Sequence, residues 1–126
     1  MFHIYFDENY GVALIEPHDA LSTDDFQLVG DIIDPYIEKY GKLNGLIIAV
    51  KSFPGWDSWN ALVEHFNFVK HHRDRVKYVA VVTDSIIGEI AEHIASHFVN
   101  ATIRRFEFDQ LDAAKKWIEQ ESSKED

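Results

Sequence analysis

The chain has 126 residues, of which 46% are hydrophobic and 27% charged, a composition typical of a globular protein of one domain. Twelve basic and 22 acidic residues give a formal net charge of −10, which argues against binding of nucleic acid or anionic lipid through bulk electrostatics. The absence of cysteine excludes disulfides, thiol catalysis and cysteine-based metal sites. We expect one domain over residues 1–120 and a short solvated tail over residues 121–126.

The segment at the N-terminus predicts neither export nor insertion into a membrane. Residues Met1–Asp7 have no basic flank and no small-residue cleavage site, so they do not resemble a signal peptide. No apolar run approaches the roughly 18 residues that span a bilayer. We therefore expect a cytoplasmic protein without stable membrane insertion.

Two short segments predict an antiparallel hairpin at the start of the chain. Apolar and polar residues alternate over residues 2–7, which is the period of a half-buried strand, and residues 12–15 predict a second strand. Between them, Asn9 and Gly11 are residue types that accept the positive φ of a tight turn.

The next segment has the pattern of an amphipathic helix. Ser22–Asp25 is a helix-start signal and Gly41 a stop signal. Between them, apolar residues recur at helical spacing at Phe26, Val29, Ile33, Ile37 and Tyr40. Pro35 lacks the amide hydrogen that the helix needs, so we expect a kink or a break there.

The middle of the chain alternates strands with helices. Residues 46–50 and 78–82 are continuous apolar runs, typical of strands that are buried on both faces, and residues 58–72 between them have helical spacing. After the second run, residues 84–85 can cap a further helix, for which Asn100 is a left-handed stop.

The last two predicted elements are a polar strand over residues 101–108 and a helix capped by Asp109. Its inward residues are Leu111, Ala114, Trp117 and Ile118. The resulting order ββαβαβαβα favours parallel pairing with right-handed crossovers. We predict a single-domain α/β fold with a mixed five-stranded sheet, an N-terminal antiparallel hairpin followed by parallel strands, and four helices.

Apolar side chains on both faces of the central strands favour self-association. Right-handed crossovers in sequential order place the connecting helices on one face, so the other face keeps an apolar strip that contains Ile47, Ala49, Val79 or Val81. The first helix, the final helix with Trp117, or a second subunit can cover it. We favour a homodimer, because monomers rarely expose such a patch and a symmetric dimer hides it.

No motif of an enzyme or of a metal site stands out. There is no Gly-x-Ser-x-Gly elbow and no phosphate-binding glycine loop. His93 and His97 are four residues apart on an expected helix and could share a metal, but the residues between them do not match the zincin pattern. His65, His71 and His72 are interpreted as cations near a helix C-terminus. We expect no enzymatic activity, no metal and no cofactor.

Aromatic residues gather in the loop after the first central strand. Phe53, Trp56 and Trp59 fall within seven residues, beside a Pro-Gly turn. This loop leaves the carboxyl end of a strand, where parallel α/β sheets bind ligands. We predict that the 52–59 loop and helix 57–72 gate an apolar pocket lined by Phe53, Trp56, Trp59, Val63, Phe66, Ile86, Ile87 and Ile90. The alternative is that these rings cap the core.

Four segments resemble one known family. They are the hairpin, Lys51–Trp59 leading into a helix, Val81–Asp84 before the next helix, and Thr102–Asp109 followed by an Ala-Ala-Lys-Lys-Trp-Ile helix. Together they resemble the SpoIIAA-like family, a bacterial branch of the STAS domains, whose fold is shared with lipid-carrying CRAL-TRIO domains. The resemblance implies a βα superhelical fold and a non-enzymatic role, either regulatory contact with a protein or binding of a small hydrophobic ligand.

The resemblance does not extend to the phosphorylated serine of the anti-sigma-factor antagonists. That serine follows a central strand, typically as Asp-Ser before small residues, and neither Ser52 nor Ser85 matches its position. Our leading hypothesis is a cofactor-free domain that holds a small hydrophobic or lipid-like ligand between helices 57–72 and 85–99. The alternative is a STAS-type regulatory module that binds a partner protein without that phosphoserine motif.

Overall fold

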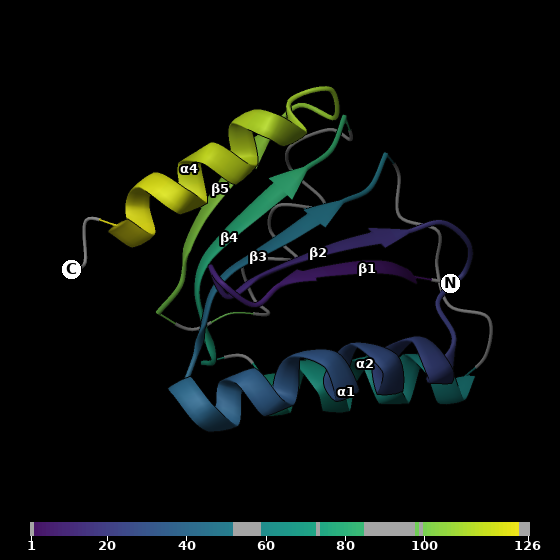
Figure 1. Ribbon diagram of the computed structural model, residues 1–126. Helices are drawn as coiled ribbons and strands as arrows, with labels where there is room; N and C mark the ends of the chain where they lie inside the picture. The colour runs from purple at the N-terminus through teal and green to yellow at the C-terminus, as the bar shows by residue number, and fades with distance from the viewer. Residues whose placement is uncertain (1, 52–58, 73, 85–97, 99, 124–126) are drawn as a thin grey trace.

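The computed structural model describes residues 2–51, 59–72, 74–84, 98 and 100–123. These residues form one five-stranded sheet between two layers of helices (Figure 1). The strands are β1 (Phe2–Asp7), β2 (Val12–Pro17), β3 (Leu43–Ala49), β4 (Val76–Val82) and β5 (Thr102–Phe106). The helices are α1 (Thr23–Tyr40), α2 (Trp59–His72) and α4 (Leu111–Ser123).

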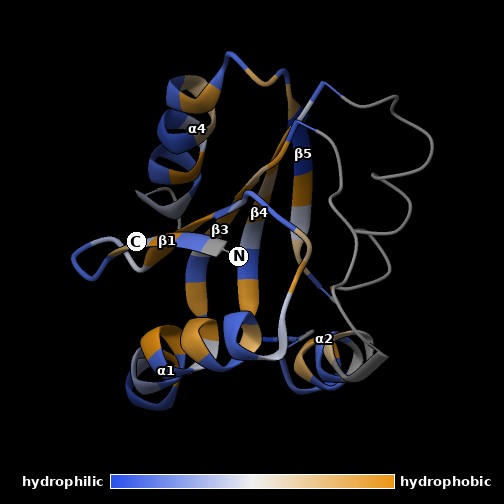
Figure 2. Ribbon diagram, turned by 90° about the vertical axis from the view of Figure 1, so that its right-hand side faces the viewer, coloured by the Kyte–Doolittle hydropathy of each residue, from blue (hydrophilic) through white to orange (hydrophobic). Residues whose placement is uncertain are grey.

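The strands follow the chain order β1-β2-β3-β4-β5 across the sheet. β1 and β2 pair antiparallel, and each later pair is parallel. This confirms the predicted α/β fold with a mixed five-stranded sheet that opens with a hairpin. Because right-handed crossovers connect the parallel strands, α1 and α2 lie side by side on one face, whereas α4 lies on the other (Figure 2).

The hairpin turn forms at the predicted residues, and of the two residues expected to accept a positive φ only Gly11 adopts it, whereas Asn9 does not. Gly11 has a φ of 68°, and its amide donates to the Asp7 carbonyl at 2.8 Å. The Asp7 carboxylate accepts from the amides of Asn9 and Tyr10 at 3.0 and 3.3 Å, which closes the turn. Any side chain at position 11 would meet both the strain of a positive φ and the ring of Tyr36.

Helix α1 begins and ends at the predicted signals. Ser22 and Asp25 form a capping box, in which each side chain accepts from the other residue's amide, and Gly41 ends the helix at a φ of 90°. Of the kink or break predicted at Pro35, the break is wrong, because the helix runs through this residue. The carbonyl that loses its hydrogen-bond partner, that of Asp31, belongs to an exposed turn, where water can bind it. The kink stays a prediction. The inward position predicted for Tyr40 is also wrong, since its side chain is 61% exposed.

The described residues hold three helices, whereas the sequence predicted four. The missing one begins at residues 84–85 in the prediction, and residues 85–97 lie outside the described part of the chain. Asn100 has a φ of 62°, as expected for a left-handed stop. α4 follows Gln110 and not Asp109, and it continues to Ser123, so part of the expected tail is helical. None of the described helices is long and apolar enough to cross a membrane.

Each face of the sheet supports its own hydrophobic cluster. The cluster under α1 and α2 includes Phe26, Val29, Ile33, Leu46 and Val79. The cluster under α4 includes Leu14, Ile47, Ala80, Ala114 and Ile118. Alternation along each strand divides the apolar residues between the two clusters.

The predicted apolar strip was placed incorrectly. Ile47 and Ala49 belong to the cluster under α4, whereas Val79 and Val81 belong to the cluster under α1 and α2. The register pairs Ile47 with Ala80, so the two valines point to the opposite face. All four side chains are buried within one chain. A second subunit is therefore not needed to cover them, and the homodimer stays a prediction.

Candidate functional site

The predicted ligand pocket lies outside the described side chains. Five of its residues belong to segments outside the described part of the chain: Phe53, Trp56, Ile86, Ile87 and Ile90. The other three lie on α2, and their own side chains are outside the described part: Trp59, Val63 and Phe66. Ser52, Ser85, His93 and His97 also lie outside the described part. The aromatic pocket therefore stays a prediction.

The carboxyl ends of the central strands are held together by polar contacts. Thr83 is buried, its hydroxyl donates to the Lys51 carbonyl at 3.4 Å, and its own carbonyl accepts from the Arg105 guanidinium at 3.1 Å. The Asp84 carboxylate, expected to cap a helix, accepts from the amide of Phe108 at 3.1 Å. These bonds fix the edge of the sheet from which the predicted pocket loops depart.

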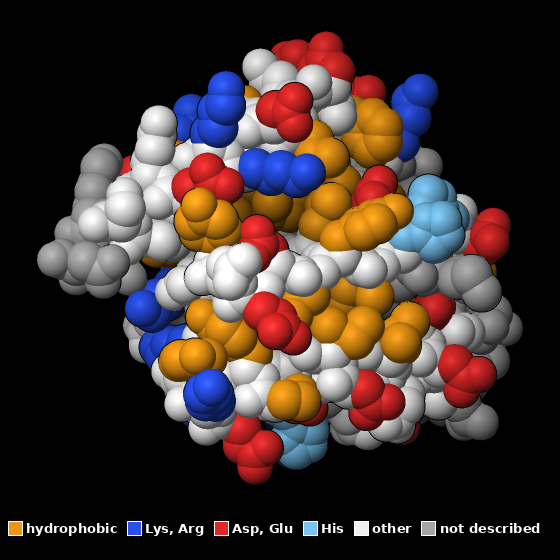
Figure 3. Space-filling view, in the orientation of Figure 1, with side chains coloured by type: hydrophobic (Ala, Val, Ile, Leu, Met, Phe, Trp, Pro, Cys, Tyr) orange, Lys and Arg blue, Asp and Glu red, His pale blue; other side chains and the backbone are white. Residues whose placement is uncertain are grey.

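A groove of about 830 Å³ lies on the other side of the molecule, between α4 and the β1–β2 hairpin (Figure 3). Its lining comes from both strands, their turn, β3 and one side of α4. The lining residues are Tyr5, Phe6, Asp7, Glu8, Asn9, Tyr10, Val12, Leu14, Glu16, Ile47, Leu111, Lys115 and Glu119. The groove is the candidate functional site of the described residues.

The floor of the groove is apolar because α4, the described helix on this face, does not extend over all five strands. α4 packs mainly on β3, β4 and β5, so the hairpin strands keep part of this face open. Leu14 and Ile47 pair across β2 and β3 and are buried at the bottom. Val12 and Leu111 are only partly buried and line the sides.

The rim of the groove contains two exposed tyrosines. Tyr5 on β1 is 58% exposed and Tyr10 in the turn is 52% exposed. The turn is fixed to the start of β3, because the Asn44 side-chain amide donates to the Tyr10 carbonyl at 2.5 Å and its backbone amide donates to the Gly11 carbonyl at 3.0 Å. The tyrosines are thus presented on a rigid support and remain available for contact.

The charges around the groove are mostly negative. Four carboxylates (Asp7, Glu8, Glu16 and Glu119) and one ammonium group (Lys115) belong to the lining. Asp7 already accepts two amides of the turn. Within the described part of the chain, none of the three glutamates forms an ion pair. Figure 3 shows acidic and basic side chains at the margins of an apolar floor.

The composition of the groove is that of a binding surface. Its described lining combines apolar side chains with two tyrosines, four carboxylates and one lysine. Among the described residues, no three histidine, cysteine, aspartate or glutamate side chains are placed to hold a metal. An apolar floor with tyrosines and a charged rim is the composition of a contact surface.

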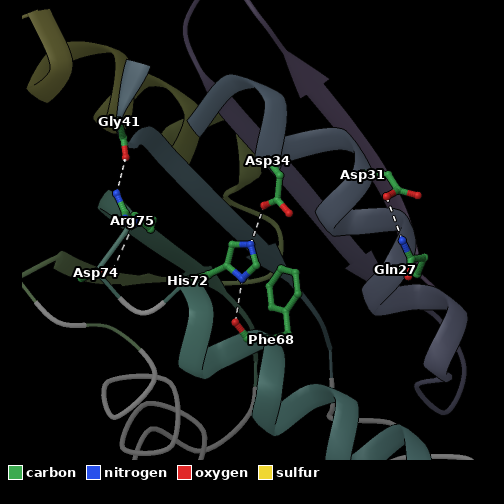
Figure 4. Close-up of polar contacts among 8 residues, drawn as sticks. All are labelled: Gln27, Asp31, Asp34, Gly41, Phe68, His72, Asp74 and Arg75. Carbon is green, nitrogen blue, oxygen red and sulfur yellow. Dashed lines mark hydrogen bonds and ion pairs between the residues drawn. The ribbon is translucent and has the colours of Figure 1, made fainter. Parts of the chain in front are cut away.

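Histidines of α2 take part in the contact between α1 and α2, which the sequence did not predict (Figure 4). Nε2 of His72 lies 2.6 Å from the Asp34 carboxylate and Nδ1 lies 2.8 Å from the Phe68 carbonyl, while the ring stacks on Phe68. His65 stacks on Phe26 of α1. No local pattern indicates these pairs, since Asp34 and His72 are 38 residues apart.

The groove was also missed from the sequence, although one signal was present. The alternation over residues 2–7 places Tyr5 and Asp7 on the face opposite Ile4 and Phe6. The sequence does not show that α4 leaves this part of the sheet uncovered, because that depends on where α4 packs.

Comparison with known proteins identifies the family. A search of curated proteins and a search of solved structures each gave no match. The family model described as SpoIIAA-like matches residues 12–119, which include β2, α1, β3, α2, β4, β5 and most of α4. Because this match spans most of the 126 residues, the chain belongs to the SpoIIAA-like family.

Proposed function

We propose that this protein is a non-enzymatic, cytoplasmic STAS-type regulatory module that binds a partner protein through the groove between α4 and the β1–β2 hairpin. Membership of the SpoIIAA-like family supports a regulatory module. We prefer this alternative to the hypothesis of a hydrophobic ligand, because the family match supports a STAS-type module and the groove has the features of an interface.

The observation that carries the proposal is the combination of an apolar floor with exposed tyrosines. A pocket for a small ligand buries most of the ligand's surface, whereas Tyr5 and Tyr10 are each more than half exposed at the rim. Tyrosine is enriched at protein interfaces, because its ring contributes apolar area and its hydroxyl keeps a polar contact. The groove therefore suits a broad partner surface.

The test is an affinity purification that compares two exposed tyrosines. Tagged wild-type protein, Tyr5→Ala and Tyr40→Ala are purified in parallel, and the bound proteins are quantified by mass spectrometry. Tyr40 is the matched control, since it is 61% exposed and lies on α1, away from the groove. We expect Tyr5→Ala to retain about tenfold less of the partner, because the loss of an interface side chain that contributes about 1.4 kcal/mol to the binding free energy lowers affinity tenfold. Tyr40→Ala should retain the wild-type amount.

Two results would contradict the proposal. Equal retention of every bound protein by both variants would show that the groove is not the contact surface. Native mass spectrometry that finds a small molecule, removable by organic solvent, and no bound protein would favour the hydrophobic-ligand hypothesis instead.

A further inference from the structure

Resting on the proposed function, we infer that the groove accepts a positively charged amphipathic helix of the partner protein, which packs beside α4 over β1 and β2. The apolar face of that helix would contact Leu14, Val12 and Tyr5, and its Lys or Arg residues would face the acidic rim.

The width of the sheet supports a second helix on this face. Neighbouring strands lie about 4.8 Å apart, so the outer strands of a five-stranded sheet are roughly 19 Å apart. Packed helices lie about 8–10 Å from each other, so a face of this width takes two of them. The opposite face holds α1 and α2, whereas α4 alone covers its own face in the described part of the chain (Figures 1 and 2).

The position and the length of the open strip also suit a helix. It lies along Leu111, Lys115 and Glu119 of α4, and residues of β1, β2 and β3 complete its lining. β1 has six residues and is therefore about 20 Å long. A helix that rises 1.5 Å per residue reaches this length with roughly 14 residues. An extended segment added to the free edge of β1 would lie in the plane of the sheet and would leave the groove empty.

Charge complementarity selects the chemistry of the occupant. Glu119 near the end of α4 and Glu8 in the hairpin turn belong to the same lining, and both elements end at the same side of the molecule (Figure 1). Glu16 adds a third carboxylate on β2, against the single ammonium of Lys115. Basic side chains on the occupant would be attracted by this rim. A second copy of this chain is a poor occupant, because each copy has a net charge of −10.

The test uses designed peptides as probes. The first is an 18-residue helix with leucines at i, i+3, i+4 and i+7 and lysines on its other face. The second has the same composition in scrambled order, and the third has glutamate in place of every lysine. Affinity is measured by fluorescence anisotropy at 0.15 M salt, and the contact site is located by NMR chemical-shift changes.

We expect the first peptide to bind at least about tenfold more tightly than either of the others, with shifts at Tyr5, Leu14 and Leu111. The double variant Glu8→Lys/Glu119→Lys should weaken this binding by about tenfold, because two attractions become repulsions. The double variant Asp31→Lys/Glu38→Lys is the matched control, since it makes the same change of net charge on exposed residues of α1, and binding should be weakened much less.

Other results would overturn the inference. If the scrambled peptide binds as tightly as the first, the peptides are attracted only by the net charge of the protein. The same conclusion follows if the two double variants lose equal amounts of affinity. Tighter binding of the glutamate peptide would contradict the charge argument. If Tyr5→Ala loses the cellular partner while no peptide binds, the proposed function stands and the cationic helix is wrong.

Discussion

The two faces of the sheet are covered to different extents. On one face, α1 and α2 lie side by side and contact each other through the His72–Asp34 pair and the ring of Phe68. On the other face, α4 lies beside an open groove. The same five strands form both faces, so the difference arises from the connections between strands.

Handedness explains which helix lies where. α1 and α2 each connect two parallel strands, and the right-handed rule places both on the same face. α4 follows the last strand and connects to no other, so this rule does not restrict it. It covers the apolar residues that the crossover helices leave exposed. Because α4 alone covers this face within the described part of the chain, part of the face stays open, and we propose that this part binds the partner.

The largest expected effect is the loss of the residue that anchors α4. Ile118 is fully buried against the sheet, so Ile118→Ala should lower the free energy of unfolding by about 3 kcal/mol, the usual cost of removing a buried isoleucine side chain. Leu111→Ala, at the half-buried side of the groove, should cost clearly less. Urea unfolding measures the free energy of unfolding of both variants. Equal losses would show that Leu111 is as buried as Ile118 and that the groove is closed.

The close approach of α4 to the sheet depends on Gly45. A Cβ atom at this position would lie 2.5 Å from Cγ2 of Ile118. Gly45→Ala should therefore lower the free energy of unfolding by about 1–3 kcal/mol, because it forces α4 away from the sheet. In the Ile118→Ala background, Gly45→Ala should cost much less, because the clashing methyl group is absent. Additive costs in this double-mutant cycle would mean that the two residues do not touch.

On the opposite face, a smaller loss is expected when the pair between α1 and α2 is broken. Asp34→Ala removes the carboxylate that contacts His72 at 2.6 Å, and it should cost about 1 kcal/mol, since Asp34 is half exposed and solvent weakens the pair. Asp74→Ala is the control, because its contact with Arg75 is longer and more exposed on both sides. The free energies of unfolding are measured with denaturant. If both variants have the same stability, the His72–Asp34 pair does not stabilise the contact between α1 and α2.

The smallest effect on stability is expected at the rim of the groove. Tyr5→Ala and Tyr10→Ala should change the free energy of unfolding by less than about 0.5 kcal/mol, because both side chains are mostly in water. Thermal unfolding followed by circular dichroism gives the comparison, with Tyr40→Ala as the reference. A loss of 2 kcal/mol or more, which is the cost of truncating a core side chain, would mean that the tyrosines stabilise the fold and do not serve as a free surface.

Most of the fold could be predicted from local patterns. The alternation in residues 2–7, the capping box at Ser22, Gly41 and the apolar runs of β3 and β4 each reflect interactions within a few residues, and the structure agrees with them. The two wrong predictions on α1, at Pro35 and Tyr40, concern features that depend on exposure to solvent and not on the local pattern. Pro35 is tolerated because the turn around it is exposed, and Tyr40 is the last residue of the helix, where its side chain is 61% exposed.

The sites depended on contacts between distant residues. The aromatic pocket around Trp56 stays a prediction, whereas the groove, which has a described geometry, was not predicted. Tyr5 and Glu119 are 114 residues apart in the chain, and only the packing of α4 brings them to one groove. The face assigned to Val79 was wrong for the same kind of reason, since the register across strands decides which residues align.

The sequence by itself determined the class of fold, the order of its elements and the membership of the SpoIIAA-like family, because hydrophobic period, helix caps and turn residues act locally. Only the tertiary structure decided which face each apolar residue covers, how closely α4 approaches the sheet at Gly45, and where a groove remains. These features depend on strand register and on the packing of a helix that no crossover constrains, and no local pattern encodes either.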